Sequence, residues 1–141
     1  MTRESWHSGT YSHGWGTSAL VGVSWGILGV HVTAPGWASF TITPKLGSLT
    51  RAAGTVPTLR GFIAVNATLT SLDVAVPCGA AATLCTPRAA ALPRLALGST
   101  ALSLDGADVA AVERKGHLCL AAPVGCGKGG APRELRWAAR V

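Results

Sequence analysis

Apolar residues recur at helical spacing near the N-terminus and at strand spacing over most of the remaining chain. Leu20, Val23, Ile27 and Val30 follow one another at intervals of three and four, which is the period of one face of an α-helix. We therefore expect residues from about 12 to 32 to be mainly helical. The Pro35-Gly36 pair that follows is a strong helix breaker and predicts the end of this segment.

Three small residues, Gly22, Gly26 and Gly29, lie between the apolar positions of the predicted helix. They allow another helix to approach closely, and they lower the intrinsic helix propensity. The helix should therefore depend on packing by neighbours. Its apolar part, residues 19–32, is shorter than the ~20 residues of a membrane span, so we predict a buried helix and no membrane span.

From residue 37 onward, short β-branched and alternating segments separated by turn residues indicate strands. Residues 62–69 are the clearest strand, and residues 80–97, rich in Ala and Pro, predict an irregular loop. The spacing of strands and turns favours an antiparallel β-sandwich. The other predicted strands cover residues 40–43, 49–56, 72–76, 101–104, 109–112, 118–121 and 134–138.

The resulting fold class is mainly β, with an N-terminal helical segment over residues 1–36 and a sandwich over residues 37–141. The predicted sandwich core consists of apolar residues on these strands: Phe40, Ile42, Val56, Ile63, Val65, Leu69, Val74, Leu102, Leu104 and Leu118.

The net charge of +6 has two interpretations. A basic chain can bind nucleic acid, but here the arginines are scattered and no nucleic-acid motif fits. The sequence therefore predicts no nucleic-acid partner. Only 13% of residues are charged, against about 25% in ordinary soluble domains, which suggests that part of the surface is covered by something outside the chain.

Residues 4–15 combine a carboxylate, Glu4, with the imidazole of His13 and the aromatic rings of Trp6 and Trp15. Sugar-binding sites use this mixture, because aromatic faces stack on sugar rings while Glu and His bind hydroxyl groups. A Glu in such a cleft can act as a general base. The alternative is a junction between two helices with buried aromatic rings.

The order of several motifs resembles the late part of the family 78 glycoside hydrolases, the α-L-rhamnosidases. The matching pieces run from a Ser-His-Gly-Trp element at residues 12–15, through Leu-Gly-Val at 28–30 and Pro-Gly at 35–36, to residues 41–49 and 53–58. The resemblance implies that residues 1–36 are the final helical segment of an (α/α)6 six-hairpin barrel. Residues 37–141 are then the C-terminal β-sandwich of such an enzyme.

The family hydrolyses terminal α-L-rhamnosides with inversion, which needs an acid and a base on opposite sides of the glycosidic bond. The resemblance makes Glu4 the candidate general base, and His13, Trp15 and Trp6 candidate substrate-binding residues. The general acid of the family lies far upstream. We therefore expect a C-terminal fragment that is inactive alone and has the remainder of the barrel and rhamnose-containing glycosides as partners.

The alternative function is a non-catalytic β-sandwich module that packs on a barrel or binds carbohydrate. Neither hypothesis requires a cofactor. Residues 1–6 do not contain the apolar stretch of a signal peptide. The sequence therefore does not decide between a secreted protein and one that stays in the cell.

The four cysteines fall as two pairs with six intervening residues, Cys78 with Cys85 and Cys119 with Cys126. This is not zinc spacing, and we predict no metal site. Each pair flanks a turn, which favours two hairpin disulfides, Cys78–Cys85 and Cys119–Cys126; four free thiols are the alternative. The N-glycosylation sequon that begins at Asn66 lies within a predicted strand, and a motif this short often occurs by chance.

Overall fold

The larger of two β-sheets combines a meander from the middle of the chain with strands from its C-terminal part. A computed structural model describes residue 14 and residues 18–87 and 102–137. Within them the larger sheet has the order β3-β4-β5-β11-β7-β8, with all neighbours antiparallel. Its strands are β3 (Arg51–Thr58), β4 (Gly61–Thr68), β5 (Ser71–Ala75), β7 (Leu102–Leu104), β8 (Ala107–Val109) and β11 (Arg133–Arg136).

The smaller sheet has the order β1-β2-β6-β10-β9 and contains one parallel pair, β2 with β6. This pair departs from the predicted all-antiparallel arrangement, and it places Phe40 opposite Ala82 and Ile42 opposite Leu84. The strands are β1 (Val30–Val32), β2 (Ser39–Ile42), β6 (Ala81–Pro87), β9 (Ala111–Arg114) and β10 (His117–Leu120). Two short 3-10 segments, Pro35–Trp37 and Lys128–Gly130, lie in connections.

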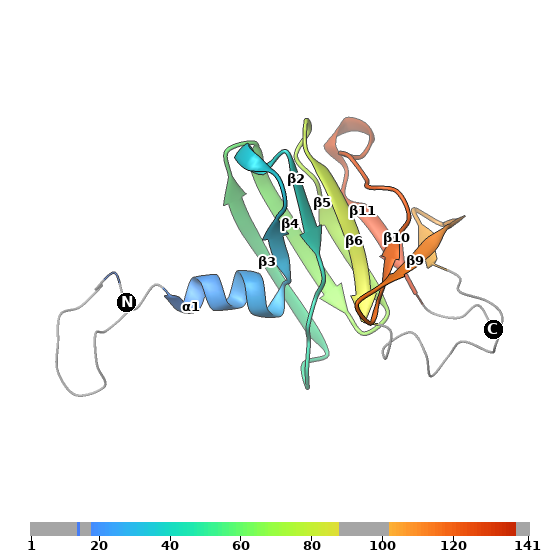
Figure 1. Cartoon of the computed structure of the whole chain (residues 1–141), viewed down its shortest axis with the longest axis horizontal. Coiled ribbons are helices and arrows are strands. Elements are labelled where there is room, and N and C mark those ends of the chain that lie inside the picture. Colours follow the sequence, from blue (N-terminus) through green and yellow to red (C-terminus); the bar gives the residue numbers. More distant parts are fainter. Residues whose placement is uncertain (1–13, 15–17, 88–101, 138–141) are drawn as a thin grey trace.

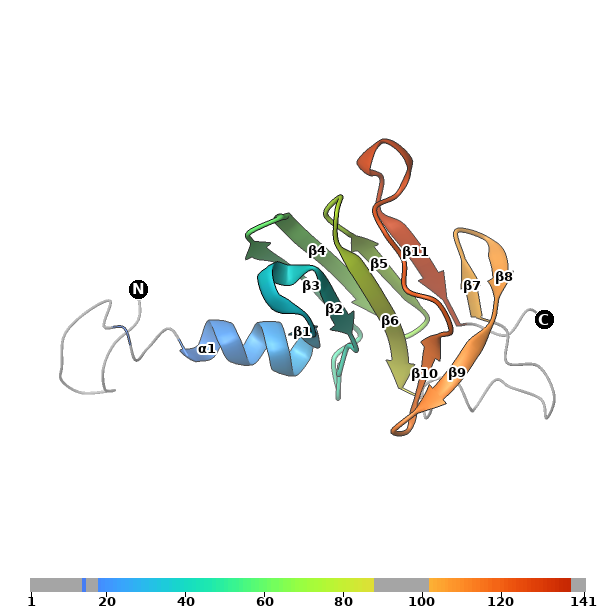
Figure 2. The ribbon, with the colours of Figure 1, turned by 45° about the horizontal axis from the view of Figure 1, so that its top comes forward.

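The two sheets lie face to face, which confirms the predicted β-sandwich (Figures 1 and 2). Side chains alternate along each strand, so every second residue enters the layer between the sheets. Phe40, Ile42 and Leu84 from the smaller sheet and Ile63 and Val74 from the larger belong to one buried cluster.

Most predicted core residues are buried, and Leu69 is the exception. Leu104 is partly buried against the core, whereas the side chain of Leu69 is 54% exposed. The strand that was predicted to reach residue 69 ends at Thr68, and Leu69 occupies the turn before β5. The predicted core residues that are buried are Phe40, Ile42, Val56, Ile63, Val65, Val74, Leu102 and Leu118.

The predicted helix is shorter than expected, because its last residues form a strand. Within the described residues, the helix comprises α1 (Ser18–Val21) and a π-helical continuation, η2 (Gly22–Ile27). Gly29 then adopts a left-handed conformation with φ of 68°, which commonly ends helices. The β-branched Val30 and Val32 pair with β2. In the described part of the chain, no helix combines the length and apolarity needed to cross a membrane.

The segment predicted as an irregular loop contains the central strand of the smaller sheet. β6 lies between β2 and β10, and the side chains of Ala82, Leu84 and Thr86 are buried. Its low aliphatic content concealed the alternation that places these side chains inward. The remainder of the predicted loop, residues 88–97, lies outside the described residues.

All four cysteines form disulfides, but the predicted hairpin pairs are wrong. Cys78 pairs with Cys126, and Cys85 pairs with Cys119. The reason is topological: Cys85 and Cys119 lie directly opposite each other on neighbouring strands β6 and β10. Both disulfides therefore join segments that are far apart in the sequence.

Candidate functional site

The residues predicted to carry catalysis and substrate binding, Glu4, Trp6, His13 and Trp15, lie outside the described residues. Their roles and their mutual geometry stay predictions. The helix that follows them in the sequence, and the sandwich to which it is joined, are described.

This helix, α1 with η2, has no buried residue and exposes a row of large apolar side chains. Leu20 is 69% exposed and Trp25 is 52% exposed, and Val21 and Val23 are also exposed. Such a surface is unusual for a soluble monomer and marks a site of contact with another element or protein. We call residues 18–27 the exposed helix.

The small residues of the exposed helix open onto empty space. A Cβ atom placed at Gly22 or Gly26 would meet no other atom within 4 Å. These positions match the expectation that small residues leave room for close packing by a second helix. Within the described residues, no helix occupies that place.

The exposed helix is firmly joined to the sandwich at its C-terminal end. The backbone NH of Lys45 donates to the carbonyl of Ile27 at 2.9 Å, and that of Thr43 donates to Gly29 at 3.0 Å. Leu28 is 2% exposed and packs into the core. The helix therefore projects from the sandwich edge in a set direction (Figure 1).

A pocket of about 800 Å³ lies on the outer face of the smaller sheet. Strand alternation creates its floor: Phe40, Ile42 and Leu84 point inward, so their neighbours point outward. The outward side chains on β2 and β6 include Thr41 and Thr83, which are opposite each other in the parallel register. Thr43, beyond the end of β2, and the Cys85–Cys119 disulfide extend this floor.

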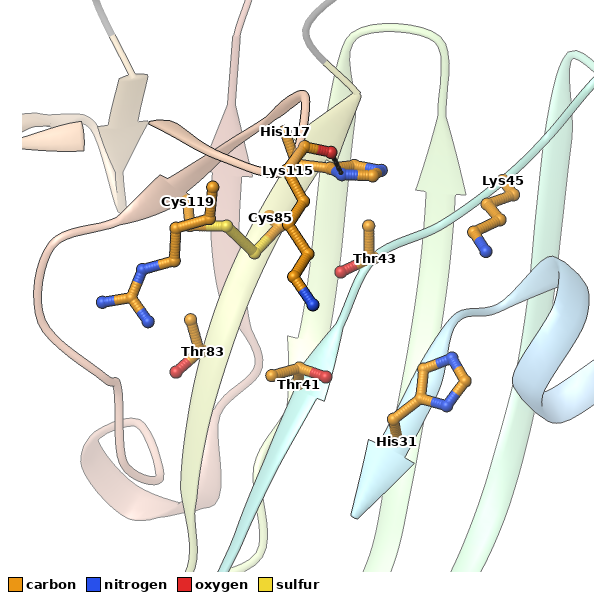
Figure 3. Close-up of a pocket in the computed structure, with 10 residues that line it drawn as sticks. His31, Thr41, Thr43, Lys45, Thr83, Cys85, Lys115, His117 and Cys119 are labelled. Atoms are coloured by element: carbon orange, nitrogen blue, oxygen red, sulfur yellow. Dashed lines mark hydrogen bonds between the residues drawn. A yellow bond between two sulfur atoms is a disulfide. The ribbon is translucent and has the colours of Figure 1, made fainter. Parts of the chain in front are cut away.

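The walls of the pocket are basic. Lys45 follows β2, while Arg114 and Lys115 lie at the turn between β9 and β10. His31 on β1 and His117 on β10 complete the lining. Figure 3 shows Lys115 extending over the sheet beside the disulfide and Lys45 beyond Thr43, near His31. We call this concavity the cationic pocket.

Backbone contacts shape the basic end of the pocket. His117 pairs with Arg114 in the β9–β10 hairpin, and the Nδ1 atom of His117 lies 3.1 Å from the carbonyl oxygen of Lys115. Lys115 adopts a positive φ of 49°, as a tight turn requires. The hairpin thus holds two cationic side chains and one imidazole at one rim.

No carboxylate from the described residues lines the cationic pocket. The ion pairs Arg133–Asp105 and Arg136–Glu134 do not involve the basic residues of the pocket. The arrangement suits anion binding through charge-assisted hydrogen bonds. The described lining residues do not include the pair of carboxylates that glycoside hydrolysis requires. No group of three metal-binding side chains gathers anywhere in the described ranges.

Sequence reasoning missed this pocket. The lining side chains come from four separated segments of the sequence, and His31 was placed in the predicted helix. One signal was available: the Thr41–Thr43 and Thr83–Cys85 alternations put hydroxyl and sulfur groups on one face. The parallel pairing of β2 with β6, which the sequence did not predict, places the Thr41–Thr43 side chains beside the Thr83–Cys85 side chains on that face.

Comparisons with known proteins agree with the sandwich. Residues 29–93 match the family model described as the bacterial alpha-L-rhamnosidase C-terminal domain. The fold is similar to the structure of an alpha-L-rhamnosidase from Dictyoglumus thermophilum, with a TM-score of 0.59 and 16% identity. The match covers 80% of this chain and 12% of that enzyme's chain. No curated protein matches the sequence.

Proposed function

We propose that the chain is the C-terminal end of an α-L-rhamnosidase, because residues 29–93 match the family model of the bacterial alpha-L-rhamnosidase C-terminal domain. In the intact enzyme, the exposed helix is the last helical segment of a catalytic (α/α)6 barrel. We assign residues 28–36, which the sequence placed with the barrel over residues 1–36, to the sandwich that follows over residues 37–141, because Leu28 and Val30 lie in its core and β1 pairs with β2. The sandwich holds the exposed helix against the barrel. The complete protein hydrolyses terminal α-L-rhamnosides with inversion.

The observation that carries this proposal is the exposed helix itself. Leu20, Val23 and Trp25 expose apolar surface, and burying such surface stabilises an assembly by about 25 cal/mol per Å². The helix is joined to the sandwich at a defined angle by Leu28 and Gly29. The matched rhamnosidase has a far longer chain, which supplies an occupant for this surface: the preceding helices of the same enzyme.

The carboxylates of the sandwich support a catalytic site outside it. Asp105 forms an ion pair with Arg133 at 2.7 Å, and Asp73 accepts a hydrogen bond from Asn66 at 2.8 Å. Glu134 is paired with Arg136. Inversion needs two carboxyl groups about 6.5–9.5 Å apart across the glycosidic bond. In our proposal Glu4 provides the base and the upstream barrel provides the acid, with His13, Trp15 and Trp6 binding the sugar.

The test compares two proteins on an aryl α-L-rhamnoside. The purified chain should show no hydrolysis, while the product that also contains the residues encoded upstream of Met1 should hydrolyse the substrate. NMR of the first product formed should show an inverted anomeric configuration. In that longer protein Glu4→Gln should lower kcat by about 100-fold or more, and the control Glu113→Gln should not.

Three outcomes oppose the proposal: retention of configuration, unchanged kcat in Glu4→Gln, and turnover by the purified chain that Glu4→Gln abolishes. The last outcome would place a complete catalytic apparatus within these residues. Absence of hydrolysis by the longer protein, together with stable binding of the chain to another protein or a glycan, would favour the second candidate function, a non-catalytic module. The cationic pocket, which is separate from the exposed helix, is the observation that favours that candidate.

A further inference from the structure

We propose that the cationic pocket binds an anionic saccharide, a sugar chain that carries carboxylate or sulfate groups. Lys45, Arg114 and Lys115 contact its charges, and Thr41 and Thr83 bind its hydroxyl groups. The pocket is a site separate from the candidate catalytic residues. Its assignment to a saccharide, and to no other anion, rests on the function proposed above.

The charge distribution calls for an anion from outside the described residues. Asp73 and Glu134 lie on the larger sheet, and Asp105 and Asp108 lie in the β7–β8 hairpin. Glu113 is the acidic residue of the smaller sheet, and it stands opposite the buried Leu118 in the register. The side chain of Glu113 therefore points to the face of β9 opposite the cationic pocket. The connection of residues 88–101 contains no Asp or Glu in its sequence.

The floor of the pocket suits a saccharide because it presents hydroxyl groups at regular spacing. Thr41 and Thr83 are adjacent across the parallel pair, and Thr43 extends the row.

The disulfide fixes the position of the floor before a ligand arrives. Cys85 and Cys119 covalently join β6 to β10, the strands that carry Thr83 and His117. A site whose groups are held in place loses little freedom on binding, which favours affinity. Both sulfur-bearing residues are buried, so the link belongs to the sheet and not to a flexible rim.

A protein partner on this face is the competing occupant, and the lining residues disfavour it. The central parts of stable protein interfaces are depleted of charged residues, whereas this pocket has three cationic side chains in its lining. The exposed helix has the apolar character expected of a packing surface. The two surfaces therefore have different chemistries and call for different occupants.

Binding of the whole 141-residue chain is measured by isothermal titration calorimetry with defined polysaccharides. Polygalacturonate supplies carboxylates, and its fully methyl-esterified form supplies the same backbone without charge. Dextran sulfate and dextran form the corresponding sulfated and neutral pair. We expect binding to one or both charged polymers and none to the neutral ones, and the charged polymer that binds identifies the anionic group.

Two variants with equal charge loss separate the pocket from the general basicity of the chain. Lys45→Gln/Lys115→Gln removes two cations from the pocket, and Arg51→Gln/Lys128→Gln removes two that lie outside it. Losing two charge-assisted contacts should weaken binding about tenfold or more. The control should stay within about twofold, because at ~0.1 M salt distant charges are screened beyond about 10 Å. Circular dichroism checks that both variants are folded.

Equal weakening by the two variants would overturn the proposal, because binding would then follow net charge. Equal binding of neutral and charged polymers, or no binding of any polymer, would also overturn the proposal. If the cationic pocket instead binds the barrel part of the enzyme, the pocket is a protein-packing surface and the proposal is wrong. The assay requires no catalysis. Hydrolysis by the longer protein with no binding by the chain refutes this inference alone. Binding by the chain with no hydrolysis by the longer protein refutes the proposed enzyme.

Discussion

The indole nitrogen of Trp137 donates a hydrogen bond of 2.9 Å to the backbone carbonyl of Leu69, a residue 68 positions earlier in the chain. The backbone NH of Trp137 also donates to the carbonyl of Thr70 at 3.2 Å. Trp137 is 5% exposed, while the side chain of Leu69 is 54% exposed. The end of β11 therefore anchors the turn between β4 and β5 through the backbone of Leu69 and not through its side chain.

Trp137→Phe should lower the free energy of unfolding by about 1–2 kcal/mol, because a part-buried carbonyl loses its donor. Trp137→Ala should cost about 3–5 kcal/mol, since it also leaves a cavity. Leu69→Ala is the matched control and should change stability by less than about 0.5 kcal/mol. Urea unfolding followed by circular dichroism measures all three, and a Leu69→Ala loss as large as that of Trp137→Phe would contradict this account.

Gly29→Ala should be strongly destabilising, because a Cβ at this position would overlap the carbonyl group of Thr43. Gly36 has a similar positive φ, 62° against 68°, but no atom lies within 4 Å of a Cβ there. Gly36→Ala should therefore cost only the left-handed strain of about 1–2 kcal/mol. Gly29→Ala should cost at least about 3 kcal/mol, since overpacking adds to that strain. Comparable urea midpoints for the two variants would be inconsistent with the contact at Thr43.

The cysteine pairing predicts which cross-linked peptides a protease releases from the unreduced protein. Mass spectrometry should find Cys78 joined to Cys126 and Cys85 joined to Cys119, and no peptide in which Cys78 is joined to Cys85. Each disulfide closes a loop with a sequence separation of 48 or 34 residues. Replacing either pair by alanine should lower the free energy of unfolding by about 3–4 kcal/mol. Equal stability of the native and reduced protein in urea would argue against structural disulfides.

The exposed helix should cause self-association of the purified chain without contributing to sandwich stability. Leu20→Ser/Trp25→Ser should shift the protein toward monomer in sedimentation velocity experiments. The free energy of unfolding should change by less than about 0.5 kcal/mol, because neither side chain is buried. Leu59→Ser is the control: Leu59 is 88% exposed but lies in the β3–β4 turn. If Leu59→Ser also abolishes association, the helix is not the contact surface.

Local pattern was sufficient to predict strands whose alternation is strong. Residues 62–69 and 72–76 became β4 and β5 because Ile63, Val65 and Val74 repeat on one face. The local pattern did not predict the secondary structure correctly where backbone geometry or a strand distant in the sequence determines it. Val30 continues the helical spacing, yet Gly29 ends the helix and Val30 pairs with β2.

Long-range pairing was the least predictable property of the fold and of the cationic pocket. The Ala-rich β6 is a strand because β2 and β10 flank it, and those neighbours lie some thirty to forty positions away in either direction. The same placement brings Cys85 to Cys119 and Thr83 to Thr41. Hairpin reasoning considers only neighbours in sequence, so it could produce neither the disulfides nor the lining of the pocket.

The parallel pairing of β2 with β6 has a consequence for the order in which the chain folds. β3, β4 and β5 pair through short turns, so they pay little loop-closure entropy and should form early. β2 is synthesised before them but must wait for β6, which follows them. During that interval Phe40 and Ile42 lack their partners Ala82 and Leu84, and an open apolar strand edge invites pairing with another chain. The soluble yield of the protein should therefore depend on how quickly β6 closes this edge after it is synthesised.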